Sequence, residues 1–450
     1  MKKIKYLLVF VLLTLSLVLA SCQPAAEAPA EPAVVPEEPA VVPEEPAVVP
    51  EEPAEGIPAD SQLEIFSWWT AGGEAEGLNA MFEVYSALYP EVEIINATVA
   101  GGAGANAKAV LATRLQGGDP PDSFQVHAGL EVEKYEPSTY LQPIDDLLDP
   151  AVFPQDLLDL LLYEGHYWTM PVNIHRSNVL WYNPKLLEEN NIAVPTTMEE
   201  FFAACETLEA AGLIPIAMGT KDGWEGAHVF ESFLPAALGA DGYRGLWTGE
   251  VSWNDPGVTQ ALEDFLTMME YVNEDHSALT WDAAGEYIIA DQAAFMIMGD
   301  WAAGWFASKG YADFGWAPPP GTDGIFVALS DAFSLPKNAP NEQAAIHWLE
   351  VAGSKAGQEA FNPAKGSICA RIDCDNAAFE VVPETYLYLT SAAEDWASDA
   401  IVPSVVHGAA SYESWATDFK DVITLFVTSG DVARTQSALA DLCVAAGICQ

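Results

Sequence analysis

The amino-acid sequence predicts an α/β fold with a largely parallel sheet. Over residues 63–127, short apolar runs alternate with segments of helical periodicity, which is typical of βαβ units. The chain has 450 residues, and a usual domain size of about 150 residues allows two or three domains. Half of the residues are hydrophobic and 14 are tryptophan, which is enough for sizeable cores and too apolar for a disordered chain.

The charge balance excludes several classes of partner. Asp and Glu number 66 against 17 Lys and Arg, which gives a formal net charge of −49 at pH 7. Such a surface repels phosphate backbones and anionic lipid, so nucleic-acid binding is excluded. The sequence contains no arginine cluster that would gather an anionic substrate.

The first 22 residues have the organisation of an export signal. Lys2, Lys3 and Lys5 precede an apolar run over residues 6–20, which is short for a membrane span and lacks a stop-transfer pattern. The run ends in Leu-Ala-Ser-Cys at residues 19–22, which resembles the lipobox of bacterial lipoproteins. We expect export and lipidation of Cys22, which anchors the chain to the outer face of the cell membrane. The alternative is an ordinary signal peptide with a chance cysteine.

Residues 23–60 predict a disordered, Pro/Glu-rich spacer. The sequence Pro-Ala-Val-Val-Pro-Glu-Glu occurs three times between residues 32 and 52. Proline has a fixed φ and no N–H, and neighbouring glutamates repel one another, so the segment is expected to be extended. At about 3 Å per residue it holds the following domain up to about 100 Å from the membrane.

The expected elements follow in order along residues 61–450. The first part predicts strands at 63–69, 92–97 and 123–127, a turn at 72–73, helices at 78–88 and 106–115, and a glycine-rich loop at 101–104. The β-rich segment 168–182 is expected to carry the chain between lobes, and 314–317 predicts a second crossover. The rest predicts helices at 197–211, 227–238, 258–272 and 342–351, strands at 293–298 and 327–335, and mostly helix beyond 391.

Five cysteines follow Cys22, and their spacing predicts two local disulfides. An exported chain permits disulfides, and the pairs Cys369–Cys374 and Cys443–Cys449 each close a short loop. Cys205 lies within a helical pattern and is expected to be a buried free thiol. A metal site is the alternative for the pairs, but no histidine lies at ligand spacing to either, so no metal is expected.

No catalytic motif occurs in the sequence. A Gly-x-Ser-x-Gly elbow, a His-Glu-x-x-His pair and a Walker loop are all absent, so neither an enzyme activity nor a cofactor is expected. The glycines at 101–104 precede a helix whose N-terminus suits an anion, but no Lys-Ser or Lys-Thr follows them. We interpret these glycines as permitting a close approach of the backbone to a ligand or to a neighbouring strand.

Aromatic and polar residues at strand ends and in loops are the candidate ligand contacts. In open α/β sheets, ligands bind beyond the carboxyl ends of the strands. Flat indole faces suit the C–H face of a pyranose, and amide, imidazole and charged groups bond its hydroxyls. These residue types therefore favour a sugar; the candidates are Trp68, Trp69, Gln125, His127, Trp301, Asp331, Lys365 and His407.

Packing is the alternative role for several of these residues. The alternation of a strand points one of Trp68 and Trp69 inward, and His127 alone suits a structural role equally well. Other aromatic residues lack a supporting context. Trp181, Trp305 and Trp316 are assigned to the core, and His166, His228, His276 and His347 to the surface or to packing.

Longer stretches resemble a known family, the extracellular solute-binding proteins of carbohydrate ABC importers, and most closely their glucose/mannose-binding branch. The resemblance covers nearly all of residues 61–450. Gly-Asp-Trp at 299–301 is shared by many sugar-binding relatives, whereas Gln-Val-His-Ala-Gly at 125–129 and Asn-Ile-His-Arg-Ser-Asn at 173–178 are much narrower. The other stretches are 63–69, 96–104, 117–124, 361–367 and 406–408.

The resemblance implies a two-lobed, periplasmic-binding-protein-like fold of type II with a hinge between the lobes. The N-terminal lobe would comprise residues 61–174 and 320–370, and the C-terminal lobe 175–319 and 371–450. Cys369 and Cys374 replace ordinary strand residues of the family, which fits a local disulfide. The ligand contacts carried over by motif are Trp68, Trp69, Glu74, Gln125, His127, Trp224, Trp301, Asp331, Lys365 and His407.

The function implied is high-affinity extracellular binding of a sugar by a monomer. Glucose or a related monosaccharide would be captured and delivered to the permease subunits of an ABC importer. One alternative is a surface-anchored glycosidase, for which Glu74 and Asp331 are the only carboxylate pair. The other is a sugar receptor that signals without transport.

Overall fold

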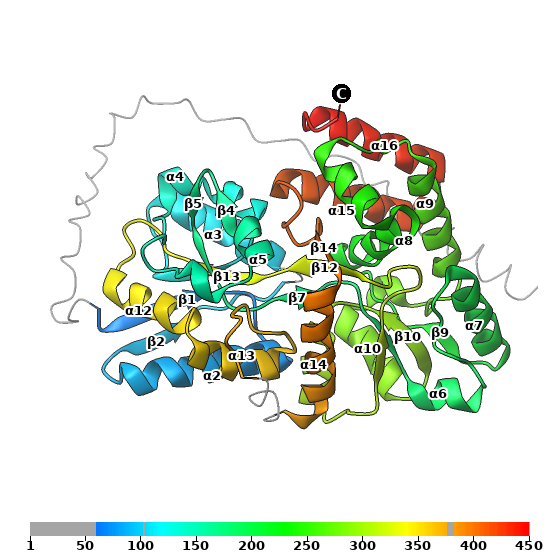
Figure 1. Ribbon diagram of the computed structural model, residues 1–450, viewed down its shortest axis with the longest axis horizontal. Helices are drawn as coiled ribbons and strands as arrows, with labels where there is room; N and C mark the ends of the chain where they lie inside the picture. Colours follow the sequence, from blue (N-terminus) through cyan, green and yellow to red (C-terminus); the bar gives the residue numbers. More distant parts are fainter. Residues whose placement is uncertain (1–59, 102–103, 376–381, 450) are drawn as a thin grey trace, which may run out of the picture. The chain divides into compact units, whose positions relative to one another are not determined.

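Two β-sheets, each flanked by helices, are joined by a third sheet (Figure 1). The computed structural model describes residues 60–101, 104–375 and 382–449, all within a unit that spans residues 57–450. The predicted signal peptide, the lipidation at Cys22 and the spacer up to residue 59 lie outside the described residues. Among the described helices, none has the length and apolar composition needed to cross a bilayer.

The first sheet contains the predicted βαβ units. Its strand order is β2-β1-β3-β13-β6, in which β1 pairs in parallel with β2 and β3, and β13 pairs antiparallel with β3 and β6. Its strands are β1 (Gln62–Phe66), β2 (Glu93–Asn96), β3 (Ser123–His127), β6 (Thr169–Pro171) and β13 (Asp331–Ser334). The helices α2 (Gly72–Leu88) and α3 (Ala105–Gly117) connect the parallel strands, which confirms the alternation predicted for residues 63–127.

Further short elements follow β3 in the chain, and two helices pack near the first sheet. The 3₁₀ turns are η2 (Leu130–Tyr135) and η3 (Pro150–Val152), and the remaining elements are α4 (Pro137–Tyr140), α5 (Gln155–Leu161), β4 (Leu162–Tyr163), β5 (His166–Tyr167), α12 (Glu342–Ala352) and α13 (Lys355–Lys365). Helix α13 lies against α2 (Figure 1).

The second sheet has the order β11-β8-β10-β9, with β9 and β10 parallel and the other pairs antiparallel. Its strands are β8 (Leu180–Tyr182), β9 (Ile214–Ile216), β10 (Ala293–Ile297) and β11 (Gly315–Ala317). The helices that follow β8 are α6 (Pro184–Glu189), α7 (Met198–Ala210), α8 (Trp224–Thr248), α9 (Pro256–Met269), α10 (Trp281–Ile289) and α11 (Trp301–Ser308), with η4 (His276–Ala278) before α10. Gly239, at φ 70°, interrupts α8 one residue after the predicted end of the 227–238 helix.

The third sheet joins the two others. It contains β7 (His175–Arg176), β12 (Ile325–Leu329) and β14 (Ala400–Pro403) in the order β14-β12-β7. Residues 169–182 run through the first, third and second sheets in turn, and residues 315–334 run through them in the reverse order. Figure 1 shows β7 and β12 between the other two sheets. Both predicted crossings are therefore present, and the predicted lobe boundaries after residues 174 and 319 fall within them.

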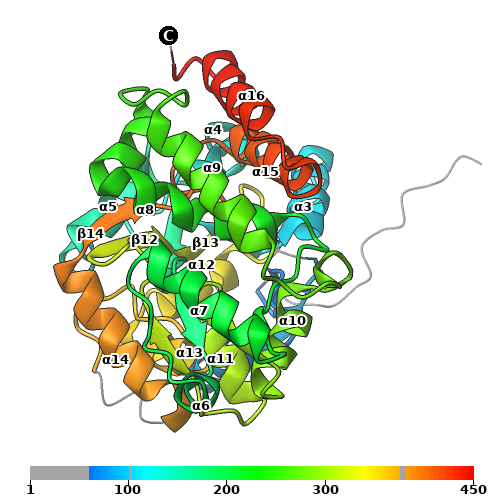
Figure 2. The ribbon, with the colours of Figure 1, turned by 90° about the vertical axis from the view of Figure 1, so that its right-hand side faces the viewer.

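Two sequence predictions about strands were wrong in detail. Residues 327–335 form two strands rather than one, because the chain leaves the third sheet at Ser330 and enters the first sheet at Asp331. Both strands are buried throughout, so the apolar run continues across the break and conceals it. The strand β14 was missed between α14 (Pro383–Ser398) and α15 (Glu413–Ser429), since its four residues show no alternation. Figures 1 and 2 show α15 and α16 (Val432–Ala445) beside α8 and α9.

Gly72 and Gly73, predicted as a turn, instead begin α2. A Cβ atom on Gly73 would lie 2.2 Å from the carbonyl oxygen of Ala364 in α13. Only glycine therefore allows α2 and α13 to approach so closely. As a result Glu74 lies in the first turn of a helix, and not in a turn that precedes it.

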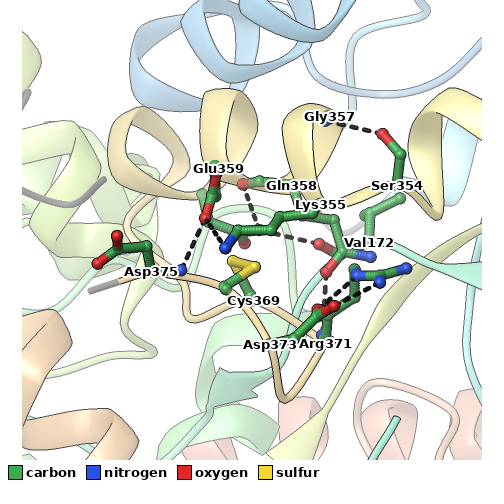
Figure 3. Close-up of a disulfide and its surroundings, with 12 residues drawn as sticks. Val172, Ser354, Lys355, Gly357, Gln358, Glu359, Cys369, Arg371, Asp373 and Asp375 are labelled. Carbon is green, nitrogen blue, oxygen red and sulfur yellow. Dashed lines mark hydrogen bonds and ion pairs between the residues drawn. A yellow bond between two sulfur atoms is a disulfide. The ribbon is translucent and has the colours of Figure 1, made fainter. Parts of the chain in front are cut away.

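The structure contains disulfides at both predicted pairs, Cys369–Cys374 and Cys443–Cys449. Figure 3 shows the first bridge beside α13, where Arg371 binds Asp373 through two nitrogen–oxygen contacts of 2.8 Å. Arg371 also donates to the carbonyl of Gly353 at 2.9 Å, so the loop is tied to the C-terminal end of α12. Cys205 is free and buried in α7, and burial raises the pKa of its thiol to about 12.

Candidate functional site

A cavity of about 640 Å³ is lined by residues from both sides of the third sheet. Its walls come from the segments after β1 and β14, the first turns of α2, α8 and α10, and helix α11 along its length. The last residues of β3, β12 and α13 and the first residues of β7 and β13 also contribute to the walls. Nine of the ten ligand contacts implied by the resemblance line it. They are Trp68, Trp69, Glu74, His127, Trp224, Trp301, Asp331, Lys365 and His407.

Trp68 and Trp69 lie beyond the end of β1 and not within it, because the strand stops at Phe66. The alternation rule therefore does not apply, and both residues line the cavity. The indole of Trp69 also packs on Phe361, with ring centroids 4.9 Å apart, and is almost fully buried.

Lys365 and Glu74 form an ion pair in the cavity wall. The Nζ atom of Lys365 donates to Oε1 of Glu74 at 2.9 Å. The same nitrogen lies 5.7 Å from the ring centroid of Trp69 and 5.8 Å from that of Trp301. Lys365 is only 2% exposed, so its charge is held by one carboxylate and two indole faces.

Asp331 is a buried carboxylate held by two amides. Gln125 Nε2 donates to Oδ1 at 3.0 Å, Asn173 Nδ2 donates to Oδ2 at 2.9 Å, and His175 Nε2 lies 3.2 Å from Oδ2. Burial opposes the charge, but the contact with His175 and the charges of Lys365 and His175 hold the pKa of Asp331 far below its usual range. Asp331 is therefore ionised at neutral pH, and a carboxylate has about four lone-pair positions for donors.

Gln125 is the one predicted contact that does not line the cavity. It is buried behind Asp331, and its Oε1 accepts a hydrogen bond from the backbone N–H of Trp68 at 3.2 Å. The side chain thus joins β1 to β13 across the sheet. Its amide orients Asp331 and leaves no group of its own on the cavity wall.

His175 lines the cavity but was not singled out as a contact, although the stretch 173–178 contributed to the resemblance. Its Nδ1 contacts Oδ1 of Asp300, whose other oxygen accepts from the backbone N–H of Arg176 at 2.8 Å. Burial lowers the pKa of His175, but the charge of Asp300 together with the hydrogen bonds to Asp300 and Asp331 outweighs burial, and the net shift is upward. Asp300 precedes Trp301, so the Gly-Asp-Trp motif fixes both the imidazole and the indole.

The buried ion pair of Lys108 and Glu131 fixes the imidazole of His127. His127 Nδ1 lies 2.6 Å from Oε2 of Glu131, and Lys108 Nζ donates to the same oxygen at 2.6 Å. Burial disfavours the Glu131 carboxylate, yet the charges of Lys108 and His127 lower its pKa well below the usual range. His127 Nε2 is then directed toward Asp331, 3.8 Å from Oδ1.

Trp301 is surrounded by imidazole and indole rings. Its ring centroid lies 5.2 Å from that of His407, 5.5 Å from that of His175 and 6.3 Å from that of Trp224. Trp305, one turn further along α11, was assigned to the core but lines the same cavity. Trp181 is fully buried, as predicted.

His228, assigned to the surface or to packing, is fully buried behind His407. Its Nδ1 lies 3.1 Å from Nε2 of His407, and its ring contacts Trp301 with centroids 5.4 Å apart. Burial lowers the pKa of both histidines, that of His407 to well below its usual range. A neutral imidazole has one donor and one acceptor nitrogen, so the pair forms a single hydrogen bond that orients His407. No feature of the local sequence distinguished His228.

His228 also leads to a prediction about stability. Burial lowers its pKa in the folded protein to about 3, whereas an exposed histidine in the unfolded chain titrates near 6.5. Between these pH values the unfolded chain binds a proton that the folded protein does not, so the free energy of unfolding falls as the pH falls below about 6.5. Between about pH 7 and about pH 5.5, this histidine alone should lower the free energy of unfolding by about 1 kcal/mol.

Urea denaturation at these two pH values tests this expectation. On acidification, the free energy of unfolding of the His228→Gln variant should fall by about 1 kcal/mol less than that of the unmodified protein. Equal losses in the unmodified protein and in His228→Gln would contradict a neutral, buried His228.

This arrangement defines a class of protein: two α/β lobes, joined by crossing segments, that line one cavity. Residues 63–359 match the family model of bacterial extracellular solute-binding proteins, and the chain belongs to this family. It is 36% identical over 386 residues to an uncharacterized ABC transporter extracellular-binding protein of Pyrococcus horikoshii. The aligned region covers 84% of this chain and 86% of that protein.

Two further proteins show the same likeness. The xylose/arabinose-binding protein XacG of Haloferax volcanii is 28% identical over 365 residues, with 78% of this chain and 77% of that protein covered. A solved structure of the bacterial solute receptor AcbH, described as exclusive for β-D-galactopyranose, has a TM-score of 0.75 at 20% identity. The match covers 86% of this chain and 99% of that chain and shows the two-lobed fold.

Proposed function

We propose that the protein binds a sugar reversibly outside the cell, with glucose or a related monosaccharide as the ring it recognises, and delivers it to the permease of an ABC importer. One observation carries this proposal. The cavity places the indole of Trp301 beside two ionised groups, Asp331 and Lys365. An indole face suits the apolar face of a pyranose, while a carboxylate and an ammonium group make strong hydrogen bonds to hydroxyls.

Other groups on the cavity wall support the same ligand. His127 and His407 contribute imidazoles, and Trp68, Trp69 and Trp224 contribute further indoles. Imidazole nitrogens form hydrogen bonds with hydroxyls, and indole faces suit the C–H face of a pyranose. The names of XacG and AcbH, which refer to sugars, agree with this ligand class.

The cavity walls are divided between the two predicted lobes, and this division suggests how sugar binding is coupled to closure of the lobes. Asp331 and Lys365 lie on the predicted N-terminal lobe, whereas Trp301 and His407 lie on the predicted C-terminal lobe. A sugar that contacts both sets stabilises the closed arrangement, because only closure makes both sets available. The closed form then docks on the permease, and a lipid anchor at Cys22 would raise its local concentration there.

The cavity favours binding over glycoside hydrolysis. A hydrolase needs one carboxyl group that is protonated at working pH, which requires a raised pKa. The pKa of Asp331 is lowered instead, and Glu74 is paired with Lys365. A receptor that signals without transport would use the same closed form.

Isothermal titration of residues 57–450 with glucose, galactose, mannose, xylose and arabinose tests the proposal. We expect saturable one-to-one binding of at least one of them with a Kd in the micromolar range or tighter. No heat with any of these sugars would contradict recognition of a single ring. Turnover of aryl glycosides by the same preparation would contradict a binding-only role.

A further inference from the structure

The turn that follows β14 carries His407, and one buried carboxylate binds the backbone of this turn. Glu231 lies on α8 and is 1% exposed. Its Oε1 accepts hydrogen bonds from the backbone N–H groups of Val405 and Val406, and its Oε2 accepts from the hydroxyl of Ser404 at 2.7 Å. The three residues before His407 are therefore all bound to a single side chain.

Ser404 connects Glu231 to the backbone of His407. While its hydroxyl donates to Glu231, the hydroxyl oxygen accepts from the backbone N–H of His407 at 3.3 Å. The carbonyl oxygen of Ser404 accepts from the N–H groups of Ala409 and Ala410, each at 2.9 Å. The turn is thus closed on both sides of His407, and Glu231 holds the residue from which these bonds are made.

The same face of α8 orients the imidazole of His407. His228 lies three residues before Glu231 on this helix, a spacing that places two side chains on one face. Its Nδ1 lies 3.1 Å from Nε2 of His407. Within the described part of the chain, Nδ1 of His407 has no hydrogen-bond partner, so this nitrogen remains for a sugar hydroxyl. Helix α8 therefore fixes His407 twice, through its backbone and through its ring.

Neutral donors, and not a cation, hold the Glu231 carboxylate. Tyr243 adds a fourth donor, whose hydroxyl lies 2.8 Å from Oε1. Burial raises the pKa of Glu231, while the hydrogen bonds from Ser404, Tyr243, Val405 and the next residue oppose the rise. A buried carboxyl group is costly unless it is hydrogen-bonded, and these donors meet it in one arrangement of the turn. An apolar side chain of similar size would fill the space without fixing the turn.

We propose that Glu231 is a positioning residue for sugar binding, which fixes the turn over residues 404–407 so that the imidazole of His407 meets the ligand. The inference rests on the proposed function and adds to it a residue that does not line the cavity. Glu231 does not touch the sugar. Its effect on affinity is exerted through His407, and this distinguishes positioning from a general contribution to stability.

A double-mutant cycle between Glu231→Ala and His407→Ala tests this inference. Calorimetry measures the Kd of whichever of glucose, galactose, mannose, xylose and arabinose binds the unmodified protein most tightly. Each single variant should raise this Kd by about 10-fold, the effect of losing about one hydrogen bond to a hydroxyl. In the His407→Ala background, Glu231→Ala should change the Kd by less than about 2-fold, because no imidazole is left to position.

Further variants separate positioning from loss of stability. Glu231→Gln keeps a carbonyl oxygen for the backbone N–H groups, so its Kd should stay within about 3-fold of that of the unmodified protein. Phe233→Leu disturbs the packing of α8 on Phe265, outside the cavity, and should lower the unfolding temperature without changing the Kd. If Glu231→Ala fails to fold, Ser404→Ala replaces it in the cycle and should show the same coupling to His407.

The outcomes distinguish this inference from the proposed function. An equal rise in Kd on Glu231→Ala with and without His407 would overturn the positioning role and leave sugar binding in place. An unchanged Kd in a folded Glu231→Ala variant would overturn it as well. Failure of all five sugars to bind the unmodified protein would overturn the proposed function itself, and this inference with it.

Discussion

Replacement of Asp331 by alanine is expected to weaken sugar binding by about 2–4 kcal/mol, a rise in Kd of roughly 30- to 1,000-fold. Gln125, Asn173 and His175 each use one lone-pair position of the carboxylate, which leaves about one position for a sugar hydroxyl. Each hydrogen bond to a charged group contributes about 1.5–3 kcal/mol. Loss of the carboxylate also removes a negative charge that faces Lys365 and His175.

Isothermal titration of Asp331→Ala with the sugar that binds the unmodified protein measures this effect. Asp331→Asn keeps the shape of the side chain and removes its charge, so its Kd should lie between those of the unmodified protein and Asp331→Ala. Asp313 is exposed and lies outside the cavity, and Asp313→Ala should leave the Kd unchanged. A thermal unfolding curve for each variant shows whether the fold is kept. An unchanged Kd in a folded Asp331→Ala would remove this carboxylate from the site.

Replacement of Trp301 by alanine should weaken sugar binding by about 1–3 kcal/mol, a rise in Kd of roughly 5- to 150-fold. The indole lies at the first position of α11, packs against His175 and His407, and lines the cavity. Without the indole, the apolar face of the sugar loses its partner and remains exposed to water. The Lys365 ammonium group also loses one of its two ring contacts.

Trp301→Phe distinguishes stacking from general damage to the fold. A phenyl ring keeps a flat apolar face, so this variant should recover part of the affinity that Trp301→Ala loses. Trp396 is half-buried on α14 and packs on Phe326 outside the cavity, so Trp396→Ala serves as the control. Equal affinities for Trp301→Ala and the unmodified protein would exclude the indole from the binding site.

Local sequence patterns were sufficient for much of the fold. The alternation over residues 63–127 predicted the parallel part of the first sheet, and a short apolar run at 293–298 identified β10. The crossover predicted at 314–317 coincides with β11, whereas β9 was not predicted. The spacing of four cysteines matched the pairs joined in the structure. Each of these features is encoded within a few residues, since an element or a short loop depends on its own periodicity and spacing.

Candidates at strand ends and in loops gave seven residues that line one cavity, and the family resemblance added Glu74 and Trp224. The first set was found because ligands bind beyond the carboxyl ends of strands in open α/β sheets. The same reasoning could not separate Gln125 from His127, two residues later on the same strand. Hydrogen bonds to Trp68 and Asp331 hold the Gln125 side chain behind Asp331. Asp331 is 206 positions away in the sequence. The roles of His175, His228 and Trp305 likewise depend on neighbours that the sequence does not place beside them.

The sequence by itself therefore determined the class of fold, the family and the residue types of the site. Only the tertiary structure decided that residues 325–334 divide between two sheets, which brings Asp331 to the cavity. It also decided that Lys365 meets Glu74 across 291 positions of the chain. The first feature arises where two segments cross between lobes in opposite directions, and the second where α13 packs against α2. Periodicity records which face of an element is buried, but not which distant element covers it.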